Sequence, residues 1–225
     1  MERAHPKSDV RETENSRGVF ERDIYPLFIL QALTGLVFTA LSFYIGYYHG
    51  EFILSTINIP QTGTSTSISN RLAYAICCSL PMLISLIAGV QMTATKRALT
   101  GAANPLSGNE RYVQVHKNYT TNTVEQFVVG VTLMLIIAAY TDNPQVLRLL
   151  PVYSFVFTVS RILFWIGYTI YPFYRTLGMS TGFMSTFFML GMTIFYSWTN
   201  GLAAVLGYQQ LLDNLSDGQL GHQEL

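Results

Sequence analysis

The chain has 225 residues, of which 50% are hydrophobic and only 12% are charged, with 13 basic and 13 acidic side chains. A soluble domain carries about 25% charged residues, so this chain has too few charges to cover a water-exposed surface and is typical of a membrane protein. The balanced charge excludes a nucleic-acid binder, because phosphate contacts require a basic excess. The two cysteines, Cys77 and Cys78, are adjacent within an apolar run, which excludes a disulfide scaffold and predicts two buried thiols.

The N-terminal part of the chain divides into three segments. Residues 1–23 hold five basic and six acidic side chains with almost nothing apolar, which predicts a disordered tail and excludes a signal peptide. Residues 24–49 are free of acidic, lysine and arginine side chains and exceed the roughly 20 residues that cross a bilayer, so they predict a first transmembrane helix and an uncleaved signal anchor. Residues 50–70 form a Ser/Thr-rich loop.

Four further apolar runs follow, and they predict an all-α integral membrane protein with five spans. The runs cover residues 72–95, 126–141, 149–174 and 181–198. The third run has only 16 residues, so Glu125 is predicted to lie in the first buried turn of its helix. Asn200-Gly201 are predicted to break or bend the last helix, which leaves residues 201–225 as an apolar segment and a polar tail.

The positions of lysine and arginine predict the orientation. With the N-terminus in the cytosol, ten basic residues lie in cytosolic segments, and only Arg71 and Arg148 lie on the opposite side. Membrane proteins concentrate Lys and Arg on the cytosolic side, so this orientation is favoured. It places the 50–70 loop and the C-terminal tail in the lumen or outside the cell. Of the two glycosylation sequons, at Asn118 and Asn214, only Asn214 is then available for modification.

Two ionisable residues fall within the predicted spans. Glu125 begins the third helix, and Arg161 lies midway along the fourth. A charge at membrane depth costs at least about 2.5–3.5 kcal/mol, which makes each residue a functional candidate. One interpretation is that the two charges pair and hold their helices together. The other is that they line a polar pocket that opens to the cytosol.

Helical spacing extends this polar face on both helices. Arg161, Phe164, Trp165, Tyr168 and Arg175 follow helical spacing on one face, and Asn122 and Glu125 are three residues apart on another helix. Two arginines, an asparagine, a carboxylate and a phenol suit an anionic, peptide-like or lipid-headgroup ligand, whereas ordinary packing equally explains the aromatic residues. His116 and Lys117 are predicted to lie in a loop, and the four histidines show no metal-ligand spacing.

These residues resemble the motifs of the MAPEG superfamily, the membrane-associated proteins in eicosanoid and glutathione metabolism. The similar motifs are Asn122-Thr-Val-Glu125-Gln-Phe and Arg161-x-x-Phe-x-x-Gly-Tyr168-x6-Arg175. The resemblance implies a four-helix bundle over residues 71–200, preceded here by one extra transmembrane helix, and a homotrimer that binds glutathione between subunits. It implies glutathione contacts for Asn122, Glu125, Arg161 and Tyr168, and stabilisation of the glutathione thiolate by Arg175.

The chain departs from the enzymes of this superfamily at three points. Asn118 stands where the enzymes usually have an arginine, Phe164 replaces a common tyrosine, and the N-terminal helix is additional. Arg97, with Lys96, is a candidate to replace the missing arginine as a ligand-binding residue. With its five predicted helices, charged N-terminal tail and Val-Glu-Gln-Phe helix start, the chain looks more like the mattrin branch, which is associated with secretory-organelle trafficking.

Three functional hypotheses follow. The first is a non-catalytic or weakly catalytic regulator of the endomembrane system or plasma membrane, which acts through lateral contacts with the lipid bilayer and with other membrane proteins. The second is a glutathione-dependent transferase or peroxidase that acts on lipophilic electrophiles. The third is a small channel or transporter, which no internal repeat or unwound helix pair in the sequence supports.

Overall fold

The computed structural model describes residues 7–50, 67–102, 109–171 and 173–206, and these segments are helical. Five helical segments are long and apolar enough to cross a membrane, which confirms the predicted all-α integral membrane fold. The helices are α1 (Lys7–His49), α3 (Ile68–Cys78), α4 (Leu80–Thr100), the 3-10 helix η2 (Asn109–Tyr112), α5 (Gln114–Tyr140), α6 (Pro144–Leu147), α7 (Leu149–Ile170) and α8 (Arg175–Leu206).

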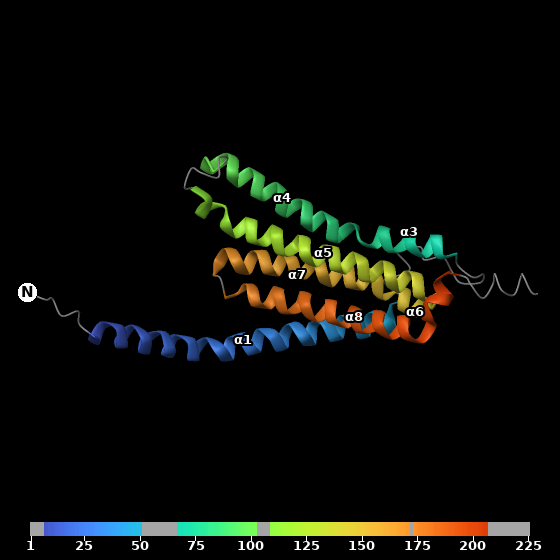
Figure 1. The fold of residues 1–225 in the computed structure, drawn as a ribbon, viewed down its shortest axis with the longest axis horizontal. Helices are drawn as coiled ribbons and strands as arrows, with labels where there is room; N and C mark the ends of the chain where they lie inside the picture. Colours follow the sequence, from blue (N-terminus) through green and yellow to red (C-terminus); the bar gives the residue numbers. More distant parts are fainter. Residues whose placement is uncertain (1–6, 51–66, 103–108, 172, 207–225) are drawn as a thin grey trace, which may run out of the picture.

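The helices form an elongated bundle in which α7 is central (Figure 1). Helix α7 contacts α1, α3, α4, α5, α6 and α8, and more of its span is buried than of any other candidate span. The end of α4, the start of α5, the end of α7 and the start of α8 lie together at one end of the bundle, which we call the Arg175 end. The opposite end, where α6 leads into α7, is called the Leu149 end.

The second span consists of two helices, because the chain breaks at Ser79 between α3 and α4. Pro81 lies in the first turn of α4, and a proline has no N–H to donate to the carbonyl four residues earlier. Ser79 accommodates the break, since its hydroxyl donates to the carbonyl of Ile76 at 2.7 Å. The sequence predicted one uninterrupted helix here.

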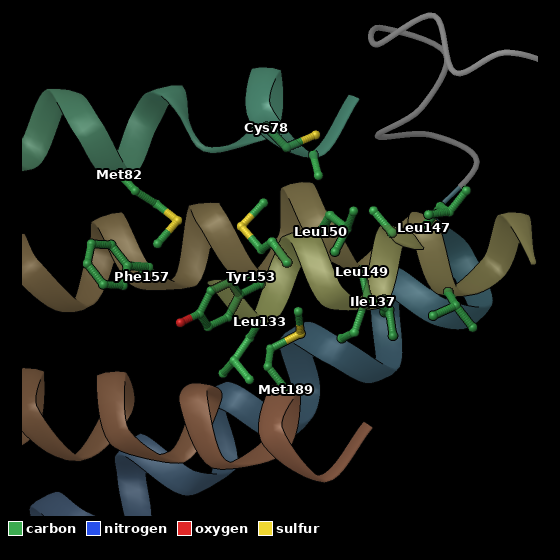
Figure 2. Close-up of a cluster of buried hydrophobic side chains, with 14 of the residues drawn as sticks. Cys78, Met82, Leu133, Ile137, Leu147, Leu149, Leu150, Tyr153, Phe157 and Met189 are labelled. Atoms are coloured by element: carbon green, nitrogen blue, oxygen red, sulfur yellow. The ribbon is translucent and has the colours of Figure 1, made fainter. Parts of the chain in front are cut away.

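The largest group of buried apolar side chains lies in the half of the bundle nearer the Leu149 end (Figure 2). Leu150, Tyr153 and Phe157 of α7 are fully buried and pack beside side chains of α1, α3, α4, α5, α6 and α8. The contributing residues include Cys78, Met82, Leu133, Ile137, Leu147 and Met189. Cys78 is buried as predicted, whereas Cys77 is exposed at the surface of the chain.

Three helices extend beyond their predicted limits. Helix α1 begins at Lys7, within the segment predicted to be a disordered tail. Adding residues to an existing helix is far easier than nucleating one, which favours such extension. Helix α8 continues through Asn200-Gly201 to Leu206, so the predicted break is wrong. A glycine inside a helix costs only about 1 kcal/mol relative to alanine, which a long helix tolerates. Helix α5 begins at Gln114, twelve residues before the predicted apolar run.

Candidate functional site

The Arg161 side chain is buried at the contact between α5, α7 and α8. It is 1% exposed, and its Nη1 donates to Oδ1 of Asn122 at 2.6 Å. Its Nε donates to the Ser160 hydroxyl at 3.3 Å. The guanidinium carbon lies 5.3 Å from the ring centroid of Phe157 and 5.5 Å from that of Phe164, within cation–π range. Arg161 is therefore held within its own chain, chiefly by Asn122.

Two glycines on α8 make room for this arrangement. A Cβ atom at Gly182 would collide with the Arg161 guanidinium, and one at Gly178 would collide with the backbone of Phe164. Gly178 and Gly182, four residues apart, thus lie where α8 packs closely on α7, as small residues permit in membrane helices. The two glycines set how near α8 comes to the buried arginine.

A second polar group lies nearer the Arg175 end. The side-chain amide of Asn118 donates to the Tyr168 hydroxyl at 2.9 Å, and the amide of Gln114 donates to Oδ1 of Asn118 at 2.8 Å. The guanidinium carbon of Arg175 lies 5.0 Å from the Tyr168 ring centroid. In the sequence, Asn118 stood out as a glycosylation sequon and for the arginine it replaces, and its role as a partner of Tyr168 was missed.

His116 belongs to this end of the bundle as a packed residue. It lies in the first turn of α5 and is buried, so the predicted loop position of His116 and Lys117 is wrong. The indole N–H of Trp165 donates to Nδ1 of His116 at 3.2 Å, and the Tyr119 ring stacks on Trp165 with centroids 5.2 Å apart. The aromatic residues of α7 on this side pack against α5, which supports the packing interpretation of the stripe.

Glu125 does not join the buried cluster. It lies within α5 but is exposed, beside the exposed Val124 and Val128. Among the described residues no ion pair joins Glu125 to Arg161, so the interpretation that these two charges pair directly is wrong. The physical reason is rotation, because three residues turn a helix by about 300° and leave Glu125 about 60° away from Asn122.

Arg97 lies in the last turn of α4 and has an acidic partner outside the cluster. Its Nη2 lies 3.5 Å from a carboxylate oxygen of Glu110 in η2. Lys117 approaches the same carboxylate at 3.9 Å. Glu110 thus links α4, η2 and α5 at the Arg175 end, a role that the sequence analysis missed. Such partly exposed pairs contribute little to stability.

The structure brings four of the six candidate residues into two adjacent groups. Asn122 pairs with Arg161, and Tyr168 pairs with Arg175, while Asn118 lies one turn from Asn122 and joins the second group. The i, i+4 spacing of Asn118 and Asn122 was the sequence signal that could have predicted Asn118 as a member. Because α5 is continuous through this region, Asn118 and Asn122 form one polar row along it. This row contacts a second polar row on α7, which consists of Arg161 and Tyr168.

These two rows lie inside the segment that matches a known family. The MAPEG family matches residues 72–195, more than half of the chain, including α4, α5, α7 and most of α8. The chain belongs to the MAPEG family. The match begins after α1, so the first helix lies outside the shared four-helix region, as the sequence resemblance implied.

Two curated relatives of this MAPEG chain are transmembrane protein 79 from Mus musculus and from Bos taurus. The mouse protein is 24% identical over 167 residues, which cover 74% of this chain and 41% of the relative. The bovine protein is 23% identical over 148 residues, which cover 66% of this chain and 36% of the relative. The chain thus spans about two fifths of their length. Transmembrane protein 79 is also called mattrin, so the predicted similarity to that branch is confirmed. No solved structure matches this chain.

Proposed function

We propose that this MAPEG-family protein is a mattrin-type regulator, non-catalytic or weakly catalytic, that acts in the endomembrane system through lateral contacts with lipids and membrane proteins. The observation that supports the proposal is the state of Arg161. Its guanidinium is enclosed by Phe157 and Phe164 and donates to Asn122 and Ser160. A guanidinium held in this way connects α5 and α7, and its bond to Asn122 competes with any incoming ligand.

The fit of glutathione to these residues is correspondingly incomplete. Arg161 is bonded to Asn122, Glu125 faces away from the cluster, and Arg97 is paired with Glu110. Of the six candidate residues, only Tyr168 and Arg175 combine partial exposure with a position at the edge of the cluster. The described part of a single chain therefore does not present the full donor set that the family resemblance implies for glutathione.

Glutathione titration of the purified protein tests this proposal. We expect no saturable binding at millimolar glutathione and no glutathione thiolate absorbance in the wild type. Saturable binding that is lost in Arg175→Ala, but kept in Arg148→Ala at the opposite end of the bundle, would contradict a non-catalytic role. The Arg148 variant is the control for removal of one arginine from a membrane protein.

The second candidate function is a glutathione-dependent transferase or peroxidase, and Arg175 favours it. The Arg175 guanidinium lies over the Tyr168 ring, is partly exposed, and has no acidic partner among the described residues. A cation of this kind lowers the pKa of a nearby thiol and makes thiolate available at neutral pH. Turnover of a lipophilic electrophile that disappears in Arg175→Ala would establish this function in place of the first.

We further propose that the protein forms a homotrimer in which the exposed face of α5 meets a second copy. Glu125 is a carboxylate within a candidate span, and its exposed neighbours Val124 and Val128 are apolar. An intramembrane charge facing lipid is costly, so a polar partner on another copy would stabilise it. Chemical crosslinking in membranes is expected to give a trimer that Glu125→Leu weakens. A monomer in both wild type and variant would contradict the proposal.

The proposed orientation keeps the N-terminus in the cytosol, in an endomembrane compartment or at the plasma membrane. The distribution of lysine and arginine supports it, because ten of the 13 lie in segments assigned to the cytosol. Glycosylation mapping in microsomes tests it directly. A glycan on Asn214 and none on Asn118 is expected, and a glycan on Asn118 would reverse the assignment.

A further inference from the structure

A cavity of about 680 Å³ lies at the Leu149 end, between α1, the α3–α4 break and α7. Its lining includes Ser42 and Ile45 of α1, Cys77 and Pro81 at the break, and Val152 and Ser154 of α7. Ser154 precedes Arg161 by seven residues, which places it about 10 Å along α7 from the buried arginine. The cavity is thus separate from the polar rows at the Arg175 end.

The sequence explains why space exists at this point. The break at Ser79 ends α3 and starts α4, so the wall formed by Cys77, Cys78 and Pro81 is not a continuous helix face. On α1, a Cβ atom at Gly46 would lie only 2.6 Å from Cγ2 of Val152. Gly46 therefore holds α1 directly against α7 beside the cavity. Helix α1 lies outside the region that matches the MAPEG family, so this cavity depends on the additional helix.

Two lining hydroxyls, those of Tyr74 and Ser154, have no hydrogen-bond partner within the described part of the chain, and Ser154 is the more deeply buried residue. Its side chain is 1% exposed. Neighbouring hydroxyls on α7 do have partners, since Thr158 donates to the carbonyl of Ser154 at 2.9 Å and Ser160 to that of Phe157 at 2.6 Å. A buried hydroxyl without a partner costs free energy, so an occupant that bonds to it is favoured.

We propose that this cavity binds one neutral lipid with a single hydroxyl group, the class that includes sterols and diacylglycerols. None of the residues that line the described cavity is charged, which disfavours a phospholipid headgroup. Ile45 is 48% exposed and Cys77 is exposed, so the cavity opens on the side of the bundle that faces the bilayer. Its volume lies within the range of about 300–1,000 Å³ that small-molecule sites occupy. The lipid hydroxyl pairs with Ser154, and its apolar body fills the remaining space.

Photolabelling of the full chain in lipid nanodiscs tests the proposal. The probe is a sterol that carries a diazirine and an alkyne, and the labelled peptides are identified by mass spectrometry. Labelling of the α3 and α7 segments that line the cavity is expected to saturate and to be displaced by unlabelled sterol. In Ser154→Ala, the half-saturating probe concentration is expected to rise about fivefold, the effect of one lost hydrogen bond.

Two substitutions on α1 distinguish binding in the cavity from nonspecific contact with bilayer lipids. Ile45→Trp places an indole in the cavity mouth, and the saturable labelling is expected to disappear. Ile29→Trp is the matched control, because Ile29 has the same side chain on the same helix, is 54% exposed and does not line the cavity. Equal labelling of both variants, or labelling that does not saturate, would overturn the proposal. Size-exclusion profiles identify any variant that fails to fold.

Discussion

The two halves of α7 hold their neighbours in different ways. Towards the Leu149 end, Leu150, Tyr153 and Phe157 pack among apolar side chains from six other helices. Towards the Arg175 end, Arg161 and Tyr168 make hydrogen bonds to Asn122 and Asn118 of a single helix, α5. The first half is therefore fixed by shape, and the second is fixed by paired polar groups.

The membrane explains why both kinds of contact are needed. Lipid tails are as apolar as leucine, so packing two apolar faces together gains no hydrophobic free energy and depends on close fit. A buried guanidinium, in contrast, has few acceptable positions, because it must keep its hydrogen-bond acceptor. Asn122 therefore fixes the rotation of α5 against α7, whereas the apolar half is held by close fit and has a cavity beside Val152.

The largest predicted effect is in the polar half. Asn122→Leu removes the acceptor of the Arg161 Nη1 and leaves part of a buried cation unpaired. We expect a loss of about 3 kcal/mol in the free energy of unfolding, because hydrogen bonds to buried charged groups are the most costly to break. Thermal or denaturant unfolding in mixed micelles measures it.

The control is the double variant Asn122→Leu/Arg161→Met, in which neither polar partner remains. Replacing both members of a buried polar pair with apolar groups is often close to neutral, so the double variant should recover most of the stability. A double variant as unstable as Asn122→Leu alone would show that shape, and not the polar pair, holds this half of α7 as well.

A smaller effect is expected where α8 crosses α7. Gly178→Ala puts a methyl group against the backbone of Phe164 and Ser160, which cannot move aside as a flexible side chain does. Overpacking of this kind typically costs 1–3 kcal/mol, and we expect about 2 kcal/mol in the same unfolding measurement. Gly191→Ala is the matched control on α8, since a Cβ atom there meets nothing within 4 Å. That control should be neutral or slightly stabilising, and equal losses in both variants would exclude a close crossing.

The spans and half of the polar site could be predicted from the sequence. Long uncharged runs place the five helices, because a charge within the bilayer is costly. The same scarcity of charge identified Arg161, and helical spacing placed Asn122 on a neighbouring helix. The interpretation that paired Arg161 with Glu125 followed charge alone and is wrong, since the rotation of α5 points Asn122 inward. A hydropathy pattern fixes the length of a helix more firmly than its rotation.

The break at Ser79 and the cavity beside it could not be predicted in this way. Pro81 in an apolar run is compatible with a kink in one helix or with the first turn of a new one. The packing of α1 on α7 could not be predicted either, because it depends on a contact between Gly46 and Val152, which are far apart in the sequence. Features that arise from packing between distant segments require the structure.

The smallest predicted effect concerns a polar contact within the apolar core, between α7 and α8. The Tyr153 hydroxyl lies 3.2 Å from the Thr186 hydroxyl, and Thr186 also donates to the carbonyl of Gly182 at 2.9 Å. Tyr153→Phe leaves Thr186 with that second partner, so we expect a loss of only about 0.6 kcal/mol, the average for such bonds between membrane helices. Unfolding in micelles again measures it. A loss as large as that of Asn122→Leu would mean that the apolar half also depends on its polar contacts, and the difference between the two halves of α7 would disappear.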